Sequence, residues 1–311
     1  MADRVQEAEQ RIRDIVNDPR RKVVLMQNRQ RWFQLCASMD AIGDTQLAVR
    51  AYLDEMRKFD DGESDGWSYI VVYGILQVLY VQQDAAKMLA SCVNLKALEL
   101  PDELESIRES RNASVGHPSG QGNFISRITL STLGFQLLVH SKGKRTEFRP
   151  VSVRRTAEQQ TEVMGAFLEQ VVEHLVADEL AHRRGFRDKP LRALLPGTLG
   201  YAQEKIGEGL REPASKPLAL GGIDSIRAAV TKFRAAIAER GLTEAYKDSV
   251  GETETEIEFA LDRIEAHLEG RLAGWSERDC DVYWFFLAEK VDELEQLAES
   301  IDKDYASDEI R

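Results

Sequence analysis

This 311-residue chain has little of what marks disulfide-rich, metal-binding or membrane proteins. Its three cysteines, Cys36, Cys92 and Cys280, lie far apart and lack the spacing of a metal site. We therefore expect free thiols and a cytoplasmic location. The longest apolar run, residues 70–81, is interrupted by a glycine and a glutamine and is too short to cross a bilayer. The sequence gives no reason to expect a membrane partner.

Several enzyme signatures are also missing. The sequence has no glycine-rich phosphate loop before a helix, no Gly-x-Ser-x-Gly and no Cys-x-x-Cys. ATPases, dinucleotide-binding enzymes and serine hydrolases are therefore unsupported. His174, Asp178 and His182 are spaced to share one face of a helix, but no second element supplies a fourth metal ligand. We expect neither a metal nor a cofactor. The net charge of −12 argues against indiscriminate binding to nucleic acid.

One short segment, 111–118, places a permanent cation near a titratable base. Arg111 stays protonated and suits phosphate oxygens, while the unperturbed pKa of histidine lets His117 take and give a proton near neutrality. In an uninterrupted helix, six steps of about 100° each would put the two on opposite sides. Gly116 can end a helix in a left-handed conformation and Pro118 cannot continue one. We therefore predict that His117 lies on a turn that folds back toward Arg111.

Arg111, Asn112 and His117 resemble the R-N-x4-H form of the R-x4-6-H signature of HEPN domains. These helical domains occur in bacterial and archaeal toxins, phage-defence proteins and RNA-cleaving effectors. The resemblance implies metal-independent RNA cleavage, usually at the interface of a homodimer. It implies that Arg111 stabilises the phosphorane, that His117 acts as general base or acid, and that Asn112 orients the pair. An antitoxin or regulatory protein is a further possible partner.

A basic segment follows this motif. Between residues 117 and 155 the chain has seven lysines and arginines against one acidic residue. We interpret this segment as the place where an RNA strand lies, and the alternative is an ordinary solvated hairpin. The predicted RNA-binding residues are Lys142, Lys144, Arg145, Arg149, Arg154 and Arg155.

The periodicity of apolar residues predicts a mainly α fold. Residues 124–153 instead alternate between apolar and polar, and they are rich in Ile, Thr, Phe and Val. They predict a small antiparallel β-meander with strands at 124–130, 134–140 and 145–153. The predicted domains are N-terminal helices at 1–43 with breaks near Pro19 and Gly43, a HEPN-like bundle at 44–186, a linker or irregular region at 187–222 with one short helix at 198–211, and a C-terminal α-helical domain at 223–311.

A polar stripe runs along the helix predicted for residues 67–94. Its members recur at helical spacing: Tyr73, Gln77, Tyr80, Asp84, Lys87 and Ser91. If the stripe faces the motif, Asp84 can pair with Arg111 and fix its guanidinium, with Arg108 beside them. We favour the simpler interpretation, that the stripe is the solvent-exposed face of an amphipathic helix.

Three functions remain open on the sequence alone. The first is an endoribonuclease that leaves 2′,3′-cyclic phosphate and 5′-hydroxyl ends. The second is a non-catalytic HEPN-like module that binds nucleotides or partner proteins. In the third the motif is coincidental, and Arg111 forms an ordinary salt bridge to a helix acid such as Asp84 or Glu105.

Overall fold

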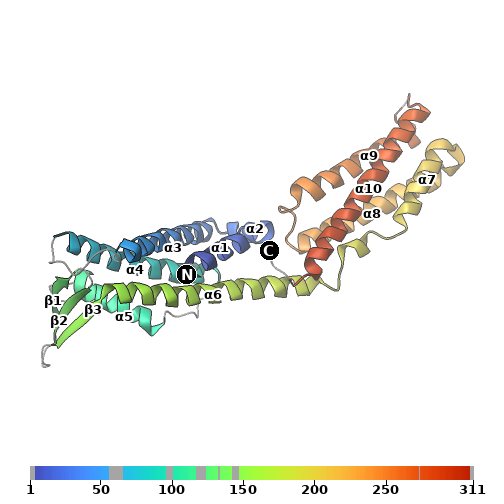
Figure 1. The fold of residues 1–311 in the computed structure, drawn as a ribbon. Helices are drawn as coiled ribbons and strands as arrows, with labels where there is room; N and C mark the ends of the chain where they lie inside the picture. The colour runs from blue at the N-terminus through green and yellow to red at the C-terminus, as the bar shows by residue number, and fades with distance from the viewer. Residues whose placement is uncertain are drawn as a thin grey trace. The chain divides into compact units, whose positions relative to one another are not determined.

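The chain is mainly α-helical, as predicted, with one three-stranded sheet (Figure 1). It divides into two compact units, each with its own core. Unit 1 comprises residues 1–17 and 25–177, and unit 2 comprises residues 18–24 and 178–311. No described helix is long and apolar enough to cross a membrane. The computed structural model describes residues 4–55, 66–95, 101–116, 124–131, 134–141, 147–272 and 274–308.

Unit 1 is a bundle of long helices. Its main elements are α1 (Arg4–Val16), α3 (Arg29–Glu55), α4 (Gly66–Cys92) and the part of α6 (Val153–Phe186) up to Ala177. Apolar residues at three- and four-residue spacing turn inward from each helix. The largest buried side chains in unit 1 include Ile12, Leu35, Ile42, Leu76, Leu79, Met164 and Phe167. The N-terminal helices are therefore part of the bundle core.

The break predicted near Gly43 is wrong, because α3 continues through this residue. A glycine inside a helix costs about 1 kcal/mol relative to alanine. The neighbouring Ile42 and Gln46 are both buried, and their packing holds the helix together. The predicted domain boundary at 43/44 consequently falls inside one continuous element.

The predicted β-meander is confirmed. Its strands are β1 (Phe124–Ser131), β2 (Gly134–Ser141) and β3 (Glu147–Ser152), antiparallel in the order β1-β2-β3. Gly134 pairs with both Ser131 and Ser152. A side chain at Gly134 would collide with the carbonyl oxygen of Val151, so this register requires glycine. The sheet lies at one end of the unit 1 bundle, beside α4 (Figure 1).

Unit 2 is also helical. Its elements are the start of α2 (Pro19–Met26), the end of α6, α7 (Leu199–Arg211), α8 (Lys216–Glu239), α9 (Glu252–Leu268) and α10 (Glu277–Ala306). The short helix predicted at 198–211 is α7, but the segment 187–222 is not a linker, because it also contains the first turns of α8 and contributes to a core. Leu191, Leu195 and Ile206 from this segment are buried in the core of unit 2. The prolines there begin helices and turns and do not mark a domain boundary.

Candidate functional site

The candidate site lies on α5 (Asp102–Arg111) and on the π-helical turn that follows it, Asn112–Gly116. Acidic residues fill the first turn of α5, where the helix dipole favours them, while Leu104 and Ile107 are buried. The chain stays helical through Gly116, contrary to the predicted helix end before that glycine. The Ser114 hydroxyl donates to the carbonyl oxygens of Ser110 and Arg111, at 2.7 and 3.2 Å. Widened turns of this kind are frequent at functional sites.

Three neutral groups hold Arg111. Its Nη2 donates to Gln77 Oε1 at 2.6 Å, and its Nη1 donates to Asn112 Oδ1 at 2.9 Å. The guanidinium carbon lies 4.4 Å from the centre of the Tyr80 ring, within cation–π range. Its Nε is buried and has no hydrogen-bond partner among the described residues. The side chain is therefore fixed in place while its charge is not neutralised by these partners.

Arg108 lies one turn earlier on α5 and contacts the same tyrosine. Its guanidinium carbon is 4.1 Å from the Tyr80 ring centre. Its Nη1 forms a salt bridge with Asp84 Oδ1 at 2.8 Å and a longer hydrogen bond with Gln83 Oε1 at 3.5 Å. Two cations thus share one aromatic ring, and only Arg108 has a carboxylate partner among the described residues.

The predicted ion pairs of Arg111 are wrong. Asp84 pairs with Arg108, and Glu105 pairs with Lys87 at 3.3 Å. The polar stripe of α4 is exposed at Gln77, Asp84, Lys87 and Ser91, in line with the interpretation that we favoured. Gln77, Asp84 and Lys87 also contact α5, so the exposed face borders a second helix. The third function considered above, in which the motif is coincidental and Arg111 forms a salt bridge with Asp84 or Glu105, therefore loses its support.

Some predicted site residues lie outside the described residues. They are His117, Lys142, Lys144 and Arg145. Arg149 lies on β3, and its side chain is likewise outside the described set.

Arg154 and Arg155 begin α6 at the surface. Arg154 Nε pairs with Glu158 Oε1 at 3.0 Å, one helical turn further on. The Arg155 backbone N–H donates to Ser152 Oγ at 3.3 Å, and its side chain is exposed. No contact between described residues joins either arginine to Arg111. An RNA-binding role for them remains a prediction.

The three residues weighed as metal ligands have protein partners. His174 Nε2 lies 3.1 Å from the Val93 carbonyl oxygen, and Asp178 pairs with Arg21 at 3.2 Å. His182 Nε2 lies 3.1 Å from the Tyr305 hydroxyl. No cluster suited to a metal ion occurs in the part of the chain that is described.

Sequence reasoning missed a chain of buried glutamines behind the site. Gln83 Nε2 donates to Gln160 Oε1 at 2.7 Å, and Gln160 Nε2 donates to Gln82 Oε1 at 2.9 Å. Gln82 Nε2 then donates to Gln46 Oε1 at 3.0 Å. Gln82, Gln83 and Gln160 have no exposed surface. The signal was available as polar residues on the inward faces of apolar helices, which need partners when they are buried.

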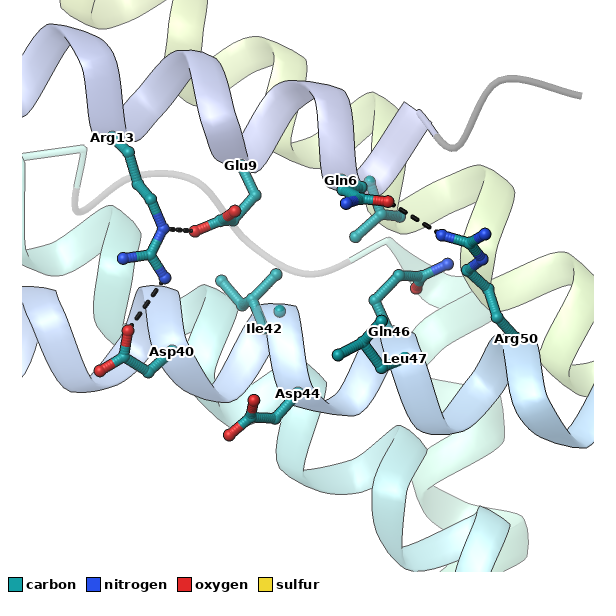
Figure 2. Close-up of a pocket in the computed structure, with 11 residues that line it drawn as sticks. Gln6, Glu9, Arg13, Asp40, Ile42, Asp44, Gln46, Leu47 and Arg50 are labelled. Atoms are coloured by element: carbon teal, nitrogen blue, oxygen red, sulfur yellow. Dashed lines mark hydrogen bonds and ion pairs between the residues drawn. The ribbon is translucent and has the colours of Figure 1, made fainter.

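A pocket of about 340 Å³ lies between α1 and α3 (Figure 2). On one side Arg13 bonds to Glu9 and, at 2.9 Å, to Asp40. On the other side Arg50 Nη1 donates to Gln6 Oε1 at 2.9 Å. Burial raises the pKa of Glu9 and outweighs the opposite effect of Arg13. Both arginines of the pocket have partners, so we regard it as a polar junction between two helices.

The geometry places the unneutralised Arg111 at the end of α5, next to Asn112 and a chain segment that leads to His117. Such an arrangement can receive an anionic oxygen, because a fixed guanidinium offers two or more donors in one plane. Nothing matches this chain in comparisons with family models, with curated proteins or with solved structures. The functional assignment therefore depends on the site itself.

Proposed function

We propose that this chain is a metal-independent endoribonuclease of the HEPN type that acts on RNA as a homodimer. Its products would be a 2′,3′-cyclic phosphate and a free 5′-hydroxyl. Toxin or phage-defence biology suits such an activity, with an antitoxin or regulatory protein as a further partner and the cytoplasm as the place of action. The proposal includes that the helices of unit 1 are arranged as in a HEPN domain.

The environment of Arg111 carries the proposal. A structural arginine usually pairs with a carboxylate, which cancels its charge. Arg111 is held instead by two amide oxygens and an aromatic face. Its orientation is thus set without loss of its attraction for a phosphate. Fixed donors that await developing charge are among the largest contributions to catalysis.

The reaction needs one attack and two proton transfers. The ribose 2′-oxygen attacks the adjacent phosphorus, and its proton passes to a base. The bond from phosphorus to the 5′-oxygen breaks, and that oxygen takes a proton from an acid. His117 fills these roles on the strength of the resemblance, and Arg111 stabilises the charge on the phosphorane. In a two-fold dimer the two copies of His117 would supply both base and acid.

The same environment also favours a second candidate function. An arginine whose charge is unneutralised suits a module that binds RNA or a nucleotide without cleaving it. The two functions differ in their need for His117. Binding through Arg111 alone does not require a base, whereas cleavage does.

The test uses the purified 311-residue chain and its His117→Ala variant with single-stranded RNA in EDTA. We expect the parent protein to cleave and the variant to be inactive with an unchanged circular dichroism spectrum. RNA with a 2′-deoxyribose at the cleaved position should resist both proteins, because the attacking hydroxyl is missing. Cleavage that persists in the variant, or that needs a divalent cation, would overturn the proposal. Binding without cleavage by either protein would favour the second function.

A further inference from the structure

The row of hydrogen-bonded glutamines reaches the candidate site at Gln83. Gln83 Oε1 accepts from Arg108 Nη1 at 3.5 Å, and its Nε2 donates onward to Gln160. Between Arg108 and Gln46, the amides of Gln83, Gln160 and Gln82 each accept at the oxygen and donate from the nitrogen. Hydrogen bonds that run in one direction polarise one another. The chain therefore begins at a cation beside the site and ends in the bundle interior.

Gln83 also holds the helix that carries the site. Its Nε2 lies 3.2 Å from the carbonyl oxygen of Leu104, on α5. Gln160, on α6, further donates to the carbonyl oxygen of Leu79, on α4, at 2.8 Å. These bonds fix α5 to α4, and α4 to α6. A slip of α5 along α4 would break the bonds of Gln83 and displace Arg108 and Arg111 together.

Stability alone does not explain these amides. When both partners of a buried hydrogen bond are replaced by apolar groups of similar shape, the change in stability is close to neutral. An apolar layer of methionine or leucine at these positions would fill the same space. What the apolar layer cannot do is define one position of α5, because apolar contacts are not directional.

We propose that Gln83 is a positioning residue for the candidate site. It bonds to α5 at the Leu104 carbonyl oxygen, 3.2 Å away, and more weakly to Arg108 at 3.5 Å, and so holds the helix that carries both Arg108 and Arg111. Gln83 has no exposed surface, so it acts without touching RNA. The effect on cleavage rests on the proposed ribonuclease function, whereas the effect on the arginines does not.

The experiment compares Gln83→Met with Gln82→Met. The two glutamines are adjacent on α4 and equally buried, and both belong to the chain, but only Gln83 contacts Arg108. We expect Gln83→Met to lower kcat by about 10- to 100-fold with little change in KM, because small displacements of catalytic groups have effects of this size. Gln82→Met should keep kcat within about threefold of the parent value, because it leaves the groups beside Arg108 in place.

A double-mutant cycle with Arg111→Met tests the route of the effect. If Gln83 acts by holding α5 and thereby Arg111, Gln83→Met will lower kcat no further in the Arg111→Met background. Equal losses in the two glutamine variants, a change confined to KM, or additive losses in the cycle would each overturn the positioning role.

A second readout does not depend on cleavage. In ¹⁵N NMR spectra, the guanidinium resonances of Arg108 should be protected from solvent exchange in the parent protein and in Gln82→Met, and should lose that protection in Gln83→Met. Unchanged protection in Gln83→Met would contradict the proposal. A parent protein that shows the protection but cleaves no RNA would refute the ribonuclease function alone.

Discussion

Two arginines, one in each unit, are held in place by opposite means. Arg227, on α8 in unit 2, reaches three carboxylates of α9: Glu258 at 3.4 Å, Asp262 at 2.5 Å and Glu265 at 3.1 Å. Arg111, in unit 1, reaches two amide oxygens and an aromatic ring. The first arrangement neutralises the cation and joins two helices. The second fixes the cation and leaves its charge for another partner.

The largest effect should come from deleting each arginine. Arg111→Ala should lower kcat/KM for RNA cleavage by about 10²- to 10³-fold with little change in Tm, because it removes a donor aimed at developing charge. Arg227→Ala should leave cleavage unchanged and lower the free energy of unfolding by about 1–2 kcal/mol, because three partly exposed acids lose their counter-charge. Cleavage assays and thermal melts of both variants test whether Arg111 serves cleavage and Arg227 serves stability. The comparison fails if Arg227→Ala lowers cleavage as much as Arg111→Ala does.

A smaller effect should follow from giving Arg111 the kind of partner that Arg227 has. Gln77→Glu replaces a neutral acceptor by a carboxylate of the same size, 2.6 Å from the guanidinium. We expect kcat/KM to fall roughly fivefold, since an exposed ion pair is worth about 1 kcal/mol. Tm should stay constant or rise slightly. Gln77→Met is the control, because it removes the acceptor without adding charge. A Gln77→Glu variant with full activity would mean that the charge of Arg111 is irrelevant.

The smallest expected effect is a difference between the two units in how their stability depends on pH. In unit 2, burial and then the nearby Arg20 lower the pKa of His182 from its ordinary value of 6.5. Burial acts to raise the pKa of Glu179, but its arginine partners, Arg20 first, lower it below 4.5. Both groups favour the deprotonated form in the folded state. Their stabilisation is therefore present at neutral pH and is lost as pH falls, first below 6.5 and then below 4.5.

In unit 1, the stabilisation contributed by Glu9 depends on pH in the direction opposite to that of His182 and Glu179. Its pKa is raised, so its contribution is greatest below 4.5 and is lost as pH rises through its folded-state pKa. The two groups that accept hydrogen bonds from Arg111, Gln77 and Asn112, are amides and carry no ionisable proton. Hydrogen exchange followed by mass spectrometry between pH 7.5 and 5 should show unit 2 losing protection before unit 1. His182→Gln should remove the step below 6.5, and an unchanged step would exclude His182 as its source.

The elements that depend on local pattern could be predicted. The meander strands lie within two residues of their predicted limits, because alternation and turn residues specify a hairpin locally. The long helix at 66–92 was predicted for the same kind of reason. Breaks between helices were harder to predict. Whether Gly43 interrupts a helix depends on packing by residues far away in the sequence. The 187–222 segment shows the same effect, because its prolines suggested a linker while its leucines are in a core.

The partners of the candidate site could not be predicted for a related reason. The stripe on α4 was visible in the sequence, but spacing along one helix does not say which other helix it meets. Asp84 was assigned to Arg111 because carboxylates attract arginines. In the fold Arg108 pairs with that carboxylate, and Arg111 bonds to Gln77, an uncharged residue two turns away on α4. The register between α4 and α5 decides this, because a shift of three residues along α5 would put Arg111 in the place of Arg108, opposite Asp84.

Because residues 112–116 form a π-helical turn, the geometry of the candidate site depends on the number of residues in that turn. A turn closed by bonds between residues five apart contains one residue more than an α-helical turn. Removing a single residue there, such as Ala113, would restore the α-helical ladder and rotate the rest of the chain by about 100° as it leaves Gly116. Every side chain of the motif would remain in the sequence, yet the direction of the segment that leads to His117 would change. One-codon deletions would therefore reveal a constraint at this position that a scan of substitutions cannot detect.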